Sequence, residues 1–225
     1  MIKPFSVGLL VVVALVVVAG GASPATPHHA SAMTTAKKAL LTLSDMPEGW
    51  TSITVPFSNP PTPGAAQLAH CIGVPVSVIT SDPPSVSSPN FTSQNGGDTV
   101  FDQISIFPSA KTARADFDVD ASPKAPKCLT ENLNGPTKGA ADAAAGSKVG
   151  SALVSRTPAS DYGPHTTNVT IFVPETSNEA TSNLEITDVT FAKGDEVQDI
   201  TLTSVGAPFP VSLARHLTTV ADARL

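Results

Sequence analysis

Charged side chains are scarce in this chain of 225 residues: Asp, Glu, Lys and Arg together make up 14% of it, and the formal net charge is −6. Lysine and arginine never form a run longer than two residues. A nucleic-acid surface needs a concentrated positive face, and anionic lipid attracts the same kind of surface. We therefore expect no nucleic-acid partner, and contact with a membrane only through the N-terminal segment.

Motifs of the common hydrolases are also missing. No Gly-x-Ser-x-Gly nucleophile elbow occurs, and no serine is followed three residues later by lysine. His28 and His29 are adjacent but lack the further ligands that a zinc site requires. His165 and His216 are isolated in the sequence. We therefore predict that the protein is not an enzyme and that it holds no metal and no cofactor.

One acidic stretch has the opening of a calcium-binding loop. Asp116, Asp118 and Asp120 follow the pattern D-x-D-x-D. The rest of the loop does not match, because Ala121 stands where the tight turn needs glycine and Lys127 stands where a bidentate glutamate belongs. We instead expect Asp116 and Asp120 to lie on the solvated face of a helix.

Export is indicated by the first 25 residues. Lys3 gives a positive start, Val7–Ala19 is an apolar run, and a signal peptidase cutting after Ala25 would find Ser23 and Ala25 at its −3 and −1 positions. The apolar run is shorter than the ~20 residues of a membrane-spanning helix. A cleaved signal peptide is therefore favoured over an uncleaved anchor formed by residues 7–22. In both cases the rest of the chain is secreted or held in the cell envelope.

The chain has two cysteines, Cys71 and Cys128. In an exported protein they are most simply paired in a disulfide. The bond would close a loop of roughly 60 residues and stabilise the fold by about 4 kcal/mol at most on chain-entropy grounds. The alternative is a reactive thiol with His70 as its base. Neighbours on a helix point away from each other, so His70 is badly placed to serve Cys71.

The pattern of apolar residues predicts an α+β fold, with an antiparallel sheet of about four to five strands and helices packed on it. The clearest unit is a strand around Val100–Ile106, followed by an amphipathic helix that Ser109 caps. The apolar phase slips between Ile186 and Val189, which predicts a β-bulge, and residues 81–97 are expected to form a proline-rich loop. Further strands are expected at 149–155, 167–173, 184–191 and 197–205, and further helices at 34–43, 65–72 and after Pro210.

Six short motifs stand out along the chain beyond the leader. They are Leu43–Trp50, Cys71–Gly73, Phe107–Ala110, Cys128–Leu129, Ala207–Pro210 and Ala223–Leu225. Together they resemble small exported actinobacterial proteins related to the extracellular sensor domains of mycobacterial receptor Ser/Thr kinases, and to neighbouring envelope lipoproteins. The resemblance implies a compact α+β domain with a groove that binds a ligand without catalysis. We therefore expect a tether at residues 26–33 and a single sensor-like domain, a monomer, at residues 34–225.

The leading hypothesis for function is a non-catalytic envelope protein that binds a small amphipathic ligand, or an envelope protein, in a cleft beside the sheet. A secreted hydrolase is the first alternative, with Glu175, Glu179 and Glu185 as candidates for the carboxylate pair that glycoside cleavage needs. A structural surface protein or antigen is the second. The sequence predicts no particular ligand-binding residue.

Overall fold

The computed structural model describes residues 27–54, 64–135, 148–158, 162–163, 165–177 and 180–225. The predicted leader, residues 1–25, lies outside these ranges. Within them, no helix is both long enough and apolar enough to cross a membrane.

Among the described residues, nine strands form one antiparallel sheet, in the order β1-β3-β4-β9-β8-β7-β5, with β2 added to β4 and β6 added to β7. The α+β class is confirmed, but the sheet is larger than the four to five strands that we predicted. Strands β1, β2 and β3 are three residues each, and two of them lie in the segment expected to be a loop, because strands this short leave no apolar period to detect. The bounds are β1 (Thr51–Ile53), β2 (Ser85–Ser87), β3 (Asn90–Thr92), β4 (Asp98–Ile106), β5 (Lys148–Val149), β6 (Leu153–Ser155), β7 (Thr166–Ser177), β8 (Ala180–Lys193) and β9 (Glu196–Val205).

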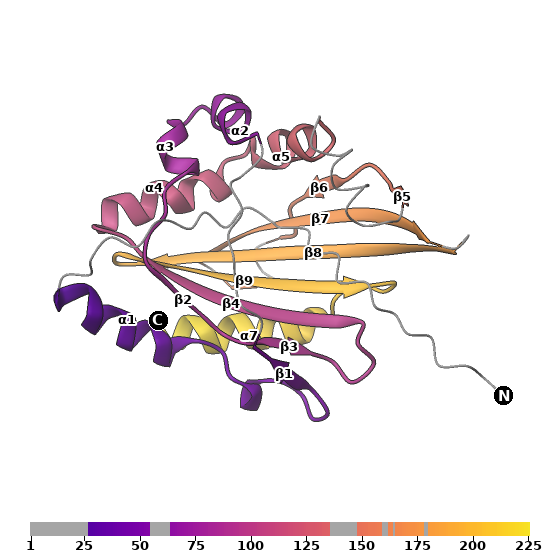
Figure 1. The fold of residues 1–225 in the computed structure, drawn as a ribbon, viewed down its shortest axis with the longest axis horizontal. Helices are drawn as coiled ribbons and strands as arrows, with labels where there is room; N and C mark the ends of the chain where they lie inside the picture. The colour runs from indigo at the N-terminus through magenta and orange to yellow at the C-terminus, as the bar shows by residue number, and fades with distance from the viewer. Residues whose placement is uncertain (1–26, 55–63, 136–147, 159–161, 164, 178–179) are drawn as a thin grey trace.

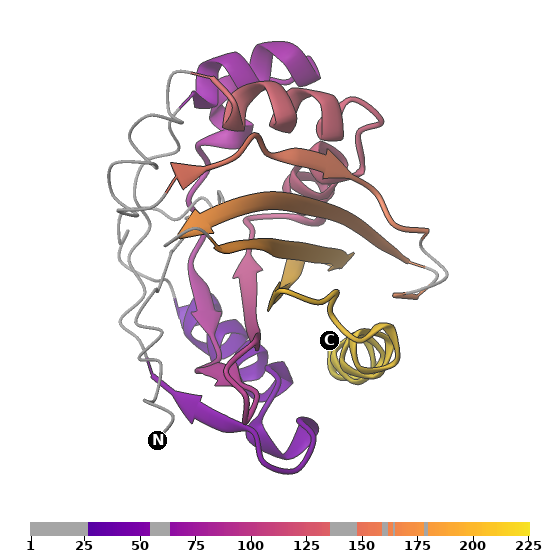
Figure 2. The same ribbon diagram turned by 90° about the vertical axis from the view of Figure 1, so that its right-hand side faces the viewer.

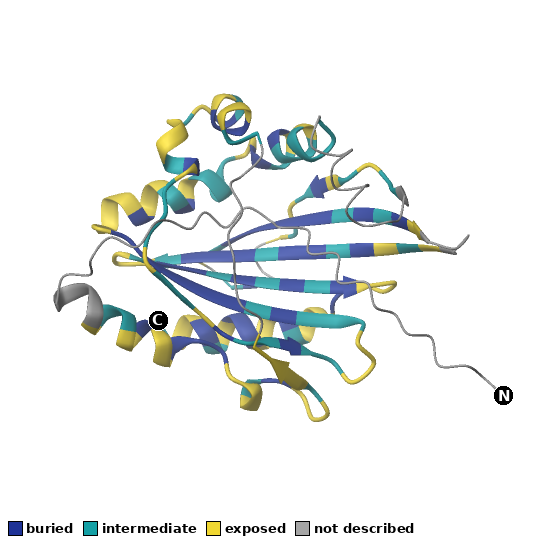
Figure 3. Cartoon of the chain, viewed as in Figure 1, coloured by how far each residue is buried: buried dark blue, intermediate teal, exposed yellow. Residues whose placement is uncertain are grey.

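Helices cover both faces of the sheet, as Figures 1 and 2 show. Helices α2, α3, α4 and α5 lie on the face that we call the α4 side, and α1 and α7 lie on the opposite face, the α7 side. The central strands between these layers are buried along much of their length (Figure 3). The helices are α1 (Pro27–Ala39), α2 (Ala65–Ile72), α3 (Val76–Ile79), α4 (Ala110–Ala121), α5 (Ala125–Leu133) and α7 (Val211–Arg224), with a short 3-10 helix η1 (Leu43–Asp45).

Strand β8 is buried on both of its faces. Leu184 and Ile186 pack on the α4 side with residues of β7, whereas Val189 and Phe191 pack on the α7 side. Pairing with β7 and β9 is continuous from Leu184 to Phe191, so the predicted bulge is wrong. The apolar phase shifts because the two halves of the strand belong to opposite cores, and no residue is inserted.

Two helices complete the α7 side. Helix α7 follows Pro210, as predicted, and buries Leu217 among apolar residues of β4, β8 and β9. Helix α1 begins at Pro27, inside the stretch that we expected to be a tether. Its Ala36, together with Leu40 just after it, packs against apolar residues of β4. The second half of the predicted tether therefore already packs on the sheet, since Ala32 and Met33 contact the same cluster.

A buried carboxylate joins the sheet to the segment after α1. Asp102 lies on β4, on the α7 side, and is 0% exposed. Its Oδ2 accepts a hydrogen bond from the Leu41 N–H at 2.7 Å, and its Oδ1 accepts one from Gln198 Nε2 at 2.8 Å. Burial raises the pKa of Asp102 to about 6, although both hydrogen bonds oppose the change.

Replacing Asp102 with alanine is expected to lower the free energy of unfolding by about 2 kcal/mol, because two buried donors lose their acceptor. Asp102→Asn keeps one carbonyl oxygen for them and is expected to cost less. Urea denaturation of both variants at pH 7.5 measures the difference. A variant Asp102→Ala as stable as the native chain would show that these two hydrogen bonds do not stabilise the fold.

Candidate functional site

A cavity of about 120 Å³ lies between the sheet and the helices of the α4 side. Four helices (α2 to α5) and four strands (β4, β7, β8 and β9) supply its lining. Most of the lining is apolar, for example Leu68 and Ile72 of α2, Leu129 of α5, and Val169 and Ile171 of β7. The carboxyl groups that line it are Asp116, Asp120, Asp188 and Asp199. The cavity thus has both apolar and acidic surface.

Helix α4 places two of these aspartates. Ser109 caps the helix, as predicted, by accepting a hydrogen bond from the Thr112 N–H, and Phe117 is buried. Asp116 and Asp120 lie one turn apart, four residues along the helix, so they face in one direction. We expected that direction to be solvent, and this interpretation is wrong: both line the cavity.

The other two aspartates come from the centre of the sheet. Asp188 of β8 is paired with Thr201 of β9, and Asp199 of β9 is paired with Thr190 of β8. Because side chains alternate across a strand, both aspartates lie on the same face as Ile186, the α4 side. Thr201 Oγ1 donates to Asp188 Oδ1 at 2.7 Å. The second oxygen, Asp188 Oδ2, is buried and has no hydrogen-bond partner among the described residues.

Loss of hydration dominates the electrostatics of the four aspartates. Burial raises the pKa of Asp116 and that of Asp188 to about 7, and raises the pKa of Asp120 to about 6. Burial also raises the pKa of Asp199 well above its ordinary value. The charge of Asp120 adds to the rise at each of the other three. Each side chain is half-buried, since the cavity reaches it while protein surrounds it. These acids therefore retain protons near neutral pH that they would lose in water.

Arg156, just after β6, brings a positive charge to one end of the cluster. Its charge opposes the rise in the pKa of Asp120. The guanidinium donates to the backbone oxygens of Asp120 and Ser122 at the C-terminal end of α4, and to Thr167 Oγ1 at 2.9 Å. Carbonyls at a helix C-terminus carry partial negative charge, so Arg156 serves the end of the helix as well as the carboxylate.

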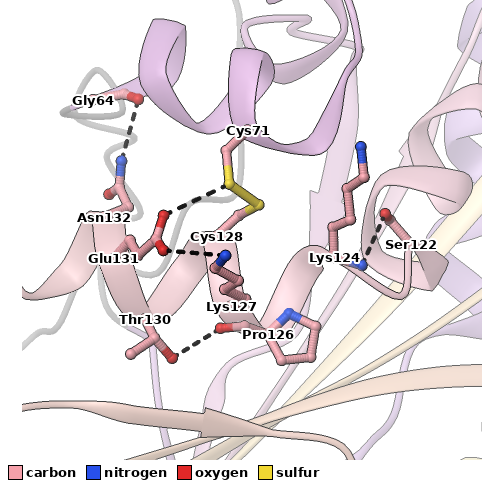
Figure 4. The surroundings of a disulfide bond; sticks show 10 residues. All are labelled: Gly64, Cys71, Ser122, Lys124, Pro126, Lys127, Cys128, Thr130, Glu131 and Asn132. Carbon is pink, nitrogen blue, oxygen red and sulfur yellow. Dashed lines mark hydrogen bonds and ion pairs between the residues drawn. A yellow bond between two sulfur atoms is a disulfide. The ribbon is translucent and has the colours of Figure 1, made fainter.

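A disulfide joins α2 and α5 (Figure 4), two of the helices that line the cavity, which we call its roof. Cys71 of α2 and Cys128 of α5 are bonded, which confirms the predicted pairing. A second link joins the same two segments, because Asn132 Nδ2 donates to the Gly64 oxygen at 3.1 Å. Disulfides are typical of proteins outside the cytoplasm, so the bond supports an extracytoplasmic location. It also rules out a free thiol at either position.

None of the histidine side chains in the described part of the chain lines the cavity. His70, His165 and His216 are exposed, and the side chains of His28 and His29 lie outside the described part of the chain. Within the ranges that the structure describes, no three His, Cys, Asp or Glu side chains converge as metal ligands.

The glutamates of the hydrolase alternative are not brought together. Glu175 lies on β7 and Glu185 on β8, where Glu185 is paired with Phe172. Strand alternation places Glu175 on the α4 side and Glu185 on the opposite face. Glu179 lies outside the described residues. The carboxyl groups that do share a cavity are aspartates that the sequence interpretation did not single out as a site.

Comparison with known proteins adds little. No protein-family model matches the chain, and no curated protein matches it. Among solved structures, the extracellular domain of PknH from Mycobacterium tuberculosis is similar with a TM-score of 0.42 and 12% sequence identity, over 91% of this chain and 98% of that one. A similarity of this size does not establish a common fold. The functional proposal therefore rests on the residues of this chain.

Proposed function

We propose that this chain is an exported, non-catalytic envelope domain that binds a small amphipathic ligand in the cavity of the α4 side. The observation that carries the proposal is the union, in one cavity, of apolar walls from α2, α5 and β7 with carboxyl groups from α4, β8 and β9. Ligand sites are typically concave and mostly apolar, with a few polar groups that orient the ligand. The disulfide supports the extracytoplasmic part of the proposal.

A secreted hydrolase is the second candidate, because raised pKa values are also typical of catalytic acids. Glycoside cleavage requires a site that holds two linked sugar rings, with the bond to be cleaved lying between two carboxyl groups. The cavity, at about 120 Å³, is smaller than the roughly 300–1,000 Å³ of most ligand sites. It is closer to the ~150 Å³ that holds a benzene molecule. Its size therefore favours binding of a small molecule over cleavage of a saccharide.

Benzyl alcohol combines a ring of this size with one polar group, and it is expected to bind the domain with saturation. Titration followed by ¹H–¹⁵N NMR should shift the amide signals of cavity residues. Val78 of α3 lines the cavity, so Val78→Trp is expected to abolish these shifts by filling the space.

Val76→Trp is the matched control, because Val76 is on the same helix but is 44% exposed to solvent. It is expected to leave binding unchanged. The proposal fails if the native domain shows no saturable shifts, or if Val78→Trp binds the probe as well as Val76→Trp does.

A further inference from the structure

Carboxyl groups outnumber cationic side chains around the cavity. Asp116 and Asp120 face it from α4, Asp188 from β8 and Asp199 from β9. Arg156 is the cation that acts on Asp120, and the charged groups that act on the other three aspartates are themselves carboxylates. A cation that entered the cavity would therefore favour the ionised form of carboxyl groups that have few cations of the protein around them.

Buried polar atoms on the α4 side of the sheet lack hydrogen-bond partners among the described residues. Asp188 Oδ2 has no hydrogen-bond partner among the described residues, although Asp188 lines the cavity and its Oδ1 is bonded to Thr201. Gln103 is 1% exposed, and both polar atoms of its side-chain amide are also unpaired in the described part of the chain. Gln103 is paired with Asp199 across β4 and β9, so strand alternation places it on the α4 side too. Unpaired buried polar atoms are costly, and a cation beside Asp188 in the cavity would compensate the carboxylate that carries one of them.

The geometry narrows the chemical class of that donor. An anion would be repelled by ionised aspartates, and a neutral alcohol would not favour their ionisation. A metal ion would need several converging oxygen ligands, and no three acidic, His or Cys side chains converge in this way within the described ranges. An ammonium group is compact, positively charged and carries three donors. The apolar walls supplied by residues such as Leu129 and Ile171 suit a short hydrocarbon substituent.

We infer that the cavity binds a small primary amine, with the ammonium group donating to the carboxyl group of Asp188 and the apolar substituent lying against α2, α5 and β7. This inference rests on the proposed function, and it adds the identity of the polar group. Binding stabilises the ionised form of the carboxylates, so it displaces protons from the aspartates. The amine is held by charge-assisted hydrogen bonds, which are about twice as strong as neutral ones.

Benzylamine and benzyl alcohol test the inference, because they share a ring and differ in the polar group. At pH 7.5 the native, oxidised domain is expected to bind benzylamine about tenfold more tightly than benzyl alcohol, since one charge-assisted hydrogen bond replaces a neutral one. Affinity for benzylamine should fall as the pH is lowered from 7.5 to 5, because the aspartates become protonated, while affinity for benzyl alcohol should change little. Calorimetry in two buffers of different ionisation enthalpy should detect the released protons.

Asp188→Asn is the decisive variant, because it removes the charge and the unpaired oxygen while keeping the size of the side chain. It is expected to bind benzylamine about tenfold more weakly than the native domain does, which is the loss expected for one charge-assisted hydrogen bond. Asp118→Asn makes the same change of charge on α4, at an exposed residue paired with Arg114 at 2.9 Å. This control is expected to bind benzylamine like the native domain.

The outcomes separate the two proposals. Equal affinity for both probes, or an unchanged affinity for benzylamine in Asp188→Asn, would overturn the amine inference while the binding cavity stands. Binding of benzyl alcohol without binding of benzylamine would have the same meaning. If neither probe binds, both the amine inference and the proposed function are wrong.

Discussion

Lowering the pH from 8 to 5 is expected to raise the free energy of unfolding of this domain by on the order of 5 kcal/mol. In the folded state the pKa is about 7 for Asp116 and Asp188 and about 6 for Asp102 and Asp120. The pKa of Asp199 is raised well above its ordinary value. In the unfolded chain each would have a pKa near 4. Between pH 4 and 7 the folded state therefore binds more protons than the unfolded state, and stability falls as the pH rises through this window.

The expected change in the free energy of unfolding is smaller than the sum of the individual pKa shifts, because the acids interact with one another. Each unit by which a folded-state pKa is raised destabilises the ionised protein by about 1.4 kcal/mol. The aspartates of the cavity repel one another, so their individual shifts do not add in full. Urea denaturation at pH 5, 6, 7 and 8 measures the total.

Two variants locate the source of the pH dependence. Asp188→Asn is expected to flatten the profile and to be more stable than the native chain at pH 8, because it removes one of the buried acids. Asp118→Asn, at an exposed position, is expected to keep the native slope. A profile in which stability rises from pH 5 to pH 8 would show that the aspartates of the cavity are solvated.

One acid on the opposite side of the sheet works in the other direction. Burial by itself would raise the pKa of Asp45, but hydrogen bonds from Arg224 and Thr42 outweigh it and hold this pKa below its ordinary value. The Arg224 Nη2 lies 2.7 Å from Asp45 Oδ1, which joins the end of α7 to η1. This ion pair stabilises the fold above the ordinary pKa of an aspartate and is lost as the pH falls below it. The stability curve should therefore have its maximum near pH 5, and it should fall on both sides.

Removing the disulfide with Cys71→Ser and Cys128→Ser is expected to lower the free energy of unfolding by about 3–4 kcal/mol. The two cysteines are separated by 57 residues in sequence. Breaking the bond frees a long loop in the unfolded chain, and its entropy then opposes folding. The bond also joins two helices of the cavity roof, so we expect the double variant to bind benzyl alcohol more weakly than the oxidised native domain does.

Reduction provides the control for the disulfide prediction. A reducing agent should lower the melting temperature of the native domain to that of the double variant, and it should not affect the double variant itself. Thermal unfolding with and without reductant gives both melting temperatures, and guanidinium denaturation gives the matching free energies of unfolding. Equal stability of the oxidised native domain and the double variant would mean that the link between Asn132 and Gly64, with the packing of α2 on α5, holds the roof alone.

The fold was predictable where a periodic pattern is long enough to read. The strand and helix around Ser109, the helix after Pro210 and the pairing of Cys71 with Cys128 follow from local rules of capping, periodicity and export. The strands of three residues were missed because each is held by pairing with a distant partner. The length of α1 was underestimated because the contacts that hold it, to β4, are formed far away in sequence.

The cavity was harder to predict than the fold. A polar residue in a strand is normally taken to face solvent, so Asp188 and Asp199 drew no attention. The available signal was their phase: Asp188 is two residues after the buried Ile186 and therefore faces the same way. Asp116 was misread because the polar face of a helix can meet a cavity as well as water. Only the arrangement of the helices over the sheet distinguishes these cases.

Burial of β8 on both faces restricts the register of the hairpin formed by β7 and β8. If β8 slid by one residue against β7, Asp188 would enter the apolar layer beneath α7, and Val189 and Phe191 would turn toward the carboxyl groups of the cavity. Both layers would be penalised by the same movement. The packing on each face of β8 therefore independently favours the same register with β7.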